Sequence, residues 1–208
     1  MSICAIDPAI TSVMIRIFIL FILIAIVLVL MNRRYDKGQK ARSEMLALQY
    51  KTMTRDLLDD TADEDLLDAV VANLNGKLDP KIPDPYHTIP LLSRERAEVY
   101  ALWLCDHELN NGNFATMQST GSFRFLDTAA DACEQIGAEK CAAALREAFQ
   151  NAADEDVLAD CHVAYMEARG EENPLTAAIP FVRDNAAAFL DVTEEADVLD
   201  DASAEQGE

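Results

Sequence analysis

The hydrophobic positions of this chain form one continuous apolar run near its start and a series of helical stripes after it. The run covers residues 13–31, reads VMIRIFILFILIAIVLVLM, and contains a single charged residue, Arg16. A helix rises about 1.5 Å per residue, so this run nearly crosses a hydrocarbon core of roughly 30 Å. Arg16 lies one turn from the N-terminal end, where its side chain can reach the interface. The pattern predicts a transmembrane helix over residues 13–31.

The charges that flank this run predict its orientation. Five basic residues follow it closely: Arg33, Arg34, Lys37, Lys40 and Arg42. The positive-inside rule then places residues 1–12 outside the cytoplasm and the rest of the chain inside it. A cleaved signal peptide is the alternative, but it needs a basic start and a small-residue cleavage site, and the run ends in Met-Asn-Arg-Arg instead. We expect a single-pass anchor in the inner (plasma) membrane with a cytoplasmic C-terminal domain.

Residues 32–60 are expected to form a basic juxtamembrane segment and a linker helix. Leu46, Tyr50, Met53 and Leu57 recur at helical spacing and predict one continuous helix over residues 36–60. This stripe either packs on the domain that follows or supports self-association. We favour packing, because the stripe is short for a coiled coil.

Helix start and stop signals divide residues 61–190. Thr61-Ala62-Asp63-Glu64 has the form of a capping box, and Asn75-Gly76 has the form of a left-handed stop for the helix between them. The prolines of residues 77–92 predict an extended connector. Later helices are expected to begin at Ser93, Asp127, Ala138, Asp154 and Asn173, with Gly137 and Gly170 as stops.

The apolar faces of these segments predict an all-α domain. The clearest face consists of Ala138, Cys141, Ala142, Leu145, Ala148 and Phe149. No alternating strand pattern and no hairpin signal occurs. The predicted fold class is therefore all-α, with a single transmembrane helix followed by a compact acidic multi-helix domain over residues 61–190. Residues 191–208 carry eight carboxylates and no basic residue, which predicts a disordered acidic tail.

The net charge of -20 is divided unevenly along the chain. Residues 1–43 carry a net charge of +4, and residues 44–208 carry -24. Phosphate binding needs lysine and arginine, so we expect no direct nucleic acid binding and favour a basic protein as the partner. The alternative is that the acidity serves solubility alone.

The residue types that usually carry catalysis or metal binding do not form a known motif here. None of the five cysteines forms a CxxC pair, which favours a reduced compartment. Cys105-Asp106-His107 and Cys161-His162 hold neighbours that point about 100° apart on a helix, unlike the spaced ligand pairs of zinc sites. The acidic run over residues 56–65 lacks the glycine of a calcium loop. We expect no catalytic residue, no cofactor, no metal and no enzymatic activity.

Glu108 lies on an unexpected side of its predicted helix. At about 100° per residue, one polar stripe collects Glu95, Glu98, Asp106 and Asn110. Glu108 falls on the other side of that helix, near Tyr100 and Trp103. A core-facing carboxylate needs hydrogen-bond donors. We expect Glu108 to accept from the backbone amides of residues 110–114 and so to brace that turn, with a catalytic acid as the alternative.

The same stretch carries a family resemblance. Glu108-Leu-Asn110-Asn111-Gly112-Asn113-Phe114 resembles the E-x-N-N-G-G-F core of an all-helical bacterial domain family, the family of DNA mimic protein nineteen. The resemblance spans about residues 62–190 and is strongest over 92–150. It implies that the five matching positions are fold determinants: Glu108, Asn110, Asn111, Gly112 and Phe114. Asn113 replaces the second glycine, and asparagine tolerates a left-handed backbone better than most residues.

The resemblance also implies a binding function. The best-known member is dimeric and strongly acidic, and it presents carboxylates in place of DNA phosphates to occupy a DNA-binding protein. A basic or DNA-binding partner and a homodimer are thus expected here. The candidate surface is Asp131, Glu134, Glu139, Glu147, Asp154, Glu155, Asp156 and Asp160, with residues 56–68 as a second acidic region. The alternative function is a structural adaptor of a membrane complex without DNA mimicry.

Overall fold

The computed structural model describes residues 40–79 and 81–191. The chain divides into an N-terminal unit, Met1–Met45, and a second unit that begins at Leu46. Residues 40–49 are helical. The predicted transmembrane helix over residues 13–31 and the predicted acidic tail beyond Asp191 lie outside the described residues. Within the described ranges, no helix is both long and apolar enough to span a bilayer.

The second unit is built from helices, and its described residues contain no strand. The all-α class is thereby confirmed for this part of the chain. In order, the helices are α2 (Arg55–Asp60), α3 (Asp63–Asn75), η1 (Ile89–Leu91), α4 (Arg94–Asn111), α5 (Phe114–Thr120), η2 (Ser122–Phe125), α6 (Leu126–Gln135), α7 (Glu139–Gln150), α8 (Glu155–Glu172), α9 (Pro174–Asp184) and η3 (Ala186–Phe189).

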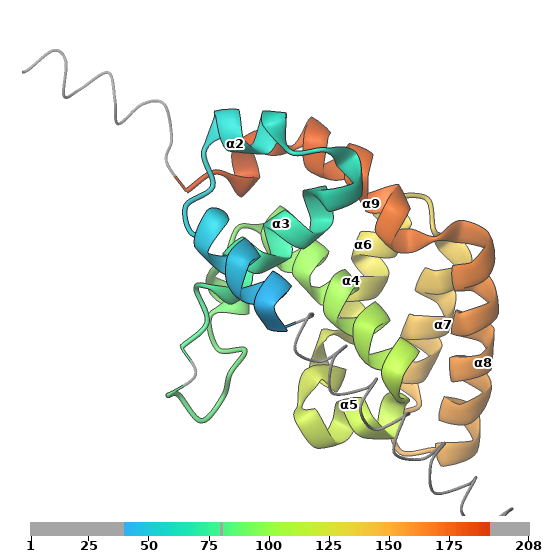
Figure 1. Cartoon of the computed structure of the whole chain (residues 1–208). Helices are drawn as coiled ribbons and strands as arrows, with labels where there is room; N and C mark the ends of the chain where they lie inside the picture. Colours follow the sequence, from blue (N-terminus) through green and yellow to red (C-terminus); the bar gives the residue numbers. More distant parts are fainter. Residues whose placement is uncertain (1–39, 80, 192–208) are drawn as a thin grey trace, which may run out of the picture. The chain divides into compact units, whose positions relative to one another are not determined.

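Helix α4 is the central element of this unit. It packs on α3, α6 and α9, and it also contacts α5 and α8. Helices α6, α7 and α8 follow one another side by side, joined by short turns (Figure 1). The largest buried side chains come from several of these helices and include Tyr100, Phe114 and Tyr165. One hydrophobic core therefore takes side chains from Tyr50 to Phe189, including α2 and η3.

Two members of the polar stripe of α4 are buried. Glu98 is only 3 % exposed and Asp106 only 2 % exposed. Glu98 accepts hydrogen bonds from Arg94 and from Gln135 of α6, both at 2.7 Å. Asp106 accepts from Tyr165 at 3.0 Å and pairs with Arg169 at 2.5 Å. Helices pack on both sides of α4, so Glu98 and Asp106 of this stripe face α6 and α8 rather than water, whereas Asn110 is exposed.

The predicted continuous helix over residues 36–60 is interrupted at residues 50–54. Tyr50 and Met53 are buried in the core, and the chain turns to place them there. The side chain of Thr54 then accepts from the amide of Leu57 and begins α2. The apolar stripe thus packs on the domain, as favoured from its length.

In the next segment, helix α3 ends at Asn75 as predicted, but the predicted capping box and the predicted left-handed Gly76 are wrong. The Thr61 hydroxyl donates to the Leu57 carbonyl at 2.6 Å, and the cap of α3 is Ala62, which provides no side-chain hydrogen bond. Gly76 has a right-handed backbone, with φ of -64°. The expected extended connector contains the short 3-10 helix η1.

The later signals are mostly confirmed. Ser93, Asp154 and Asn173 cap α4, α8 and α9 through their side chains, and Gly137 is left-handed with φ of 79°. Asp127, however, lies inside the first turn of α6, where it pairs with Arg146. Gly170 lies within α8, which ends at the left-handed Asn173 instead. Phe149 is 41 % exposed, so it does not belong to the buried face of α7.

Candidate acidic binding surface

The family-like motif forms the turn between α4 and α5. The Asn111 side chain donates to the His107 carbonyl at 2.8 Å and closes the last turn of α4. Gly112 approaches α5 so closely that a Cβ atom there would lie 2.9 Å from Thr116 Oγ1. Asn113 is extended, with φ of -157°, and its side chain accepts from the Thr116 amide at 3.0 Å. The expected left-handed Asn113 is therefore wrong, and this residue is the N-cap of α5.

Glu108 braces a different turn from the one predicted. Its carboxylate accepts from Ser122 Oγ at 2.6 Å and from Thr120 Oγ1 at 3.0 Å. These two residues flank Gly121, which is left-handed with φ of 82°. Glu108 is half-buried rather than fully core-facing. The carboxylate thus joins α4 to the α5–η2 turn and not to the amides of residues 110–114.

The other two motif side chains differ in their surroundings. Phe114 is 1 % exposed and makes edge-on ring contacts with Phe123 and His162. Asn110 is exposed. The motif therefore positions an aromatic anchor and two helix ends, which is a folding role.

The groups that would suggest catalysis have separate partners. His107 stacks on Trp103 with ring centroids 5.3 Å apart. His162 Nε2 lies 3.1 Å from the Leu109 carbonyl oxygen. Over residues 40–79 and 81–191, no three His, Cys, Asp or Glu side chains are grouped so that they could hold a metal ion.

Four cysteines lie in the helical core as free thiols. Cys105, Cys133, Cys141 and Cys161 are all buried. Burial raises the pKa of the Cys105 thiol well above its ordinary value and, together with a hydrogen bond to Glu172, raises the pKa of Cys141 to about 12. Thiols with such pKa values stay protonated and are poor nucleophiles. The predicted apolar position of Cys141 is confirmed, and Cys133 and Cys161 are buried as well.

Two of the eight candidate carboxylates share one cation. Arg146 pairs with Asp131 at 2.6 Å and with Glu134 at 3.0 Å, and it also reaches Asp127 at 3.1 Å. The hydrogen bonds to Glu134 and Asp131 raise the pKa of Arg146. Part of the acidity on α6 is therefore compensated within the fold.

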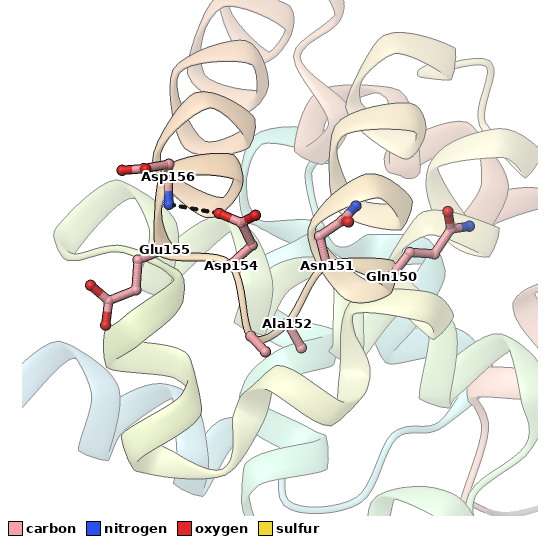
Figure 2. A pocket seen from close by; sticks show the side chains of 7 residues that line it. Gln150, Asn151, Ala152, Asp154, Glu155 and Asp156 are labelled. Carbon is pink, nitrogen blue, oxygen red and sulfur yellow. Dashed lines mark hydrogen bonds between the residues drawn. The ribbon is translucent and has the colours of Figure 1, made fainter.

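Five other candidates form what we call the α7–α8 corner: Glu147, Asp154, Glu155, Asp156 and Asp160. The loop at this corner borders an open depression of about 610 Å³ lined by residues 150–156. Asp154 turns its carboxylate toward α8 and accepts from the Asp156 amide, whereas the carboxylates of Glu155 and Asp156 point away from the loop (Figure 2). Glu147, Glu155, Asp156 and Asp160 are exposed, and none of them takes part in an ion pair between described residues.

The remaining candidates do not join this corner. Glu139 is exposed at the opposite end of α7. In the second acidic region, Asp59 pairs with Arg55 at 2.9 Å and Asp63 pairs with Arg183 at 2.8 Å. Among the eight candidates, the α7–α8 corner thus holds four exposed carboxylates that lie together without an ion pair between described residues.

One strongly held carboxylate was missed by the sequence reasoning. Asp191 was expected to begin the disordered tail, but its side chain accepts from the Met53 amide at 2.9 Å and from Asn73 at 2.7 Å. It also pairs with Lys77 at 2.8 Å and with Arg96 at 2.9 Å. No local pattern could have revealed this site, because its partners come from distant segments.

Comparison with known proteins identifies the domain. The model of the DMP19-like protein family matches residues 90–205. The described part of this match runs from η1 to η3 and includes the motif turn and the α7–α8 corner. Comparisons with curated proteins and with solved structures found no match. Since the family model covers more than half of the sequence, the chain belongs to the DMP19-like protein family.

Proposed function

We propose that the helical domain binds a basic protein through the α7–α8 corner, in the manner of a DNA mimic. The proposal is carried by a difference between carboxylates that pair with arginine and carboxylates that do not. Arg146, Arg55 and Arg183 neutralise carboxylates elsewhere, whereas Glu147, Glu155, Asp156 and Asp160 keep their charges free of ion pairs with described residues.

The spacing of these carboxylates suits the proposal. Side chains three or four positions apart on a helix lie about 5–6 Å from each other, as Asp156 and Asp160 do by position. Such a row offers closely spaced negative charges to lysine and arginine side chains that otherwise contact phosphates. Most of this attraction is electrostatic, so the complex should weaken as salt is added.

The test is capture of DNA-binding proteins by the full-length chain at low salt. We expect the captured protein to be released by duplex DNA and by added salt. The triple variant Glu155→Gln/Asp156→Asn/Asp160→Asn should weaken capture by roughly tenfold or more, because three uncompensated charges are lost. Asp154 is left unchanged because its side chain caps α8.

A matched control removes the same charge elsewhere. Glu64→Gln/Glu139→Gln/Asp184→Asn changes three exposed carboxylates outside the corner and should alter capture less than twofold. Equal losses in the two triple variants would show that net charge, and not the corner, attracts the partner. Capture that duplex DNA does not reverse would count against mimicry.

The proposal includes membrane attachment through residues 13–31. Their apolar sequence and the basic residues after them favour an anchor with the domain in the cytoplasm. Carbonate-resistant membrane fractionation and protease protection of the N-terminus would test it. Recovery of the intact chain in the soluble fraction would contradict it.

A structural adaptor without DNA mimicry is the second candidate. It is favoured by exposed apolar side chains such as Leu91, which is 80 % exposed. Its partner would bind by apolar contact, and neither high salt nor duplex DNA would release that partner.

A further inference from the structure

The outer face of α8 carries an apolar stripe that no feature described so far explains. Ala159, Val163, Met166 and Gly170 recur at spacings of four, three and four and therefore share one side of the helix. Val163 is 59 % exposed, and Met166 is partly buried. A depression of about 320 Å³ lies here, lined by His162, Val163, Met166 and Glu167.

A second, acidic stripe runs directly beside the apolar one. Asp156, Asp160, Glu167 and Glu171 lie within a sector of about 60° at about 100° per residue. Glu171 pairs with Lys140, whereas Asp160 and Glu167 take part in no ion pair between described residues. Helix α8 has 18 residues and is therefore about 27 Å long. One exposed helix face thus offers an apolar groove and a parallel row of carboxylates.

The negative charge of this face indicates which kind of molecule could cover the groove. A second copy of the same face would bring the carboxylates of Asp160 and Glu167 against their own equivalents, which is repulsive. An anionic lipid surface and DNA are repelled for the same reason. A helix with one apolar side and lysine or arginine beside it satisfies both stripes at once, as in helix-in-groove recognition.

We propose that the outer face of α8 binds a basic amphipathic helix of the partner protein. The apolar side of that helix covers Val163 and Met166, and its basic side chains meet Asp156, Asp160 and Glu167. This inference rests on the proposed function, because two of these carboxylates belong to the α7–α8 corner. It adds an apolar requirement, so the surface discriminates an amphipathic helix from a basic segment of equal charge.

The test uses two fluorescent peptides of 18 residues made only of leucine and lysine. In the first, leucines recur at spacings of four, three and four beside a stripe of lysines; the second has the same composition in scrambled order. The full-length chain is held in phosphatidylcholine nanodiscs, with empty discs as the blank. Anisotropy titrations at low salt should give an affinity roughly tenfold higher for the amphipathic peptide.

Three variants separate the apolar and the ionic contributions. Val163→Gln/Met166→Gln should remove the preference for the amphipathic peptide and leave the affinity of the scrambled peptide within twofold. Ala164→Gln/Ala143→Gln changes exposed alanines off the stripe and should preserve the preference. Asp160→Asn/Glu167→Gln should weaken both peptides. Glutamine is used because it keeps helix propensity high.

The outcomes distinguish this inference from the proposed function. Equal binding of the two peptides, or an unchanged preference in Val163→Gln/Met166→Gln, would overturn the inference while leaving an acidic binding surface in place. Failure of the wild-type chain to bind either peptide at low salt would overturn both. Sedimentation that shows a dimer abolished by Val163→Gln/Met166→Gln would assign the face to a second copy and also overturn the inference.

Discussion

Asp191 shows how one carboxylate can join segments that are far apart in the chain. Burial alone would raise its pKa, but Lys77, the Met53 amide and Asn73 outweigh burial and lower the pKa from 3.8 to about 2. The side chain is only 14 % exposed, so these contacts are little screened by water. Asp191 therefore contributes to stability as a charged group.

We expect Asp191→Asn to lower the free energy of unfolding at neutral pH by about 2 kcal/mol. The folded pKa lies below the ordinary value, so the contribution is complete above about pH 4 and is lost as the pH falls toward about 2. Urea unfolding followed by circular dichroism should show the two proteins converging over that range. Asp184→Asn, an exposed control, should change little, and a gap that persists unchanged at about pH 2 would contradict the assignment.

The hydrogen bond between Glu108 and Ser122 should be measurable as an energetic coupling between the two side chains. Its hydrogen bond with the fully buried Ser122 involves a charged acceptor and is therefore stronger than a neutral one. Glu108→Gln and Ser122→Ala should be coupled by about 1 kcal/mol in a double-mutant cycle. The control cycle combines Glu108→Gln with Asn111→Ala. The Asn111 side chain donates to the His107 carbonyl and not to Glu108, so the effects of these two substitutions on the free energy of unfolding should add. Additivity in both cycles would refute the bracing role.

The limits of sequence reasoning are clearest at single polar residues. The helical angle of Glu108 correctly indicated that it needs donors, but the angle cannot name the segment that supplies them. Asp106 and Glu98 lie on a polar stripe, yet both are buried and are bonded by Arg169 and Gln135 from other helices. Local patterns define the side of a helix, whereas tertiary packing decides what covers that side.

At the scale of elements, α7 depends on a cap from another helix. Its N-cap residue, Ala138, provides no side-chain hydrogen bond. The carboxylate of Glu172, at the end of α8, accepts instead from the amides of Lys140 and Cys141, both at 3.0 Å. Burial raises the pKa of Glu172, but these hydrogen bonds outweigh burial and lower it below 4.5. The carboxylate that caps α7 comes from the end of α8, so no local signal near Ala138 could have indicated it.

We expect Glu172→Gln to lower the free energy of unfolding by about 1 kcal/mol, because the charge at the helix N-terminus is lost. Since the folded pKa is lowered, wild-type stabilisation is present above the ordinary value of 4.5 and disappears as the pH falls below it. Hydrogen exchange should quicken at the first amides of α7. Glu171→Gln removes an exposed pair with Lys140, which water screens, and should cost clearly less than Glu172→Gln. Equal costs for the two variants would contradict the capping role of Glu172.

For the molecule as a whole, apolar periodicity predicted the all-α class and, except for Phe149, the buried face of α7. Periodicity could not show that α4 is central. A central helix is buried on several sides, and the buried polar residues of α4 interrupt the apolar pattern that would indicate this burial. The acidic surface was foreseen as eight carboxylates, but the sequence could not show that Arg146 compensates two of them and leaves the α7–α8 corner uncompensated.

The family match begins at residue 90, whereas the compact unit begins at Leu46. The preceding segment contributes seven large side chains to the core cluster: Tyr50, Met53, Leu58, Leu66, Val70, Leu74 and Ile89. Burying each is worth about 1.5–3 kcal/mol at most, so together they approach the roughly 5–15 kcal/mol that stabilises a whole domain. Arg183 adds hydrogen bonds to the Leu58 and Thr61 carbonyls at 2.6 and 2.5 Å.

A fragment of residues 90–208 should therefore not fold cooperatively, although it contains the whole family match. Removing residues 46–89 exposes the apolar surfaces of α4 and α9 that face α3, and it takes Met53, Asn73 and Lys77 away from Asp191. We expect a broad thermal transition and strong binding of a hydrophobic dye, whereas residues 46–208 should unfold in one sharp step. Lys77→Ala in the longer fragment separates the two contributions, because it removes an ion pair and leaves the apolar contacts. A sharp transition in residues 90–208 would mean that the family domain is autonomous and that α2 and α3 are only an addition to its surface.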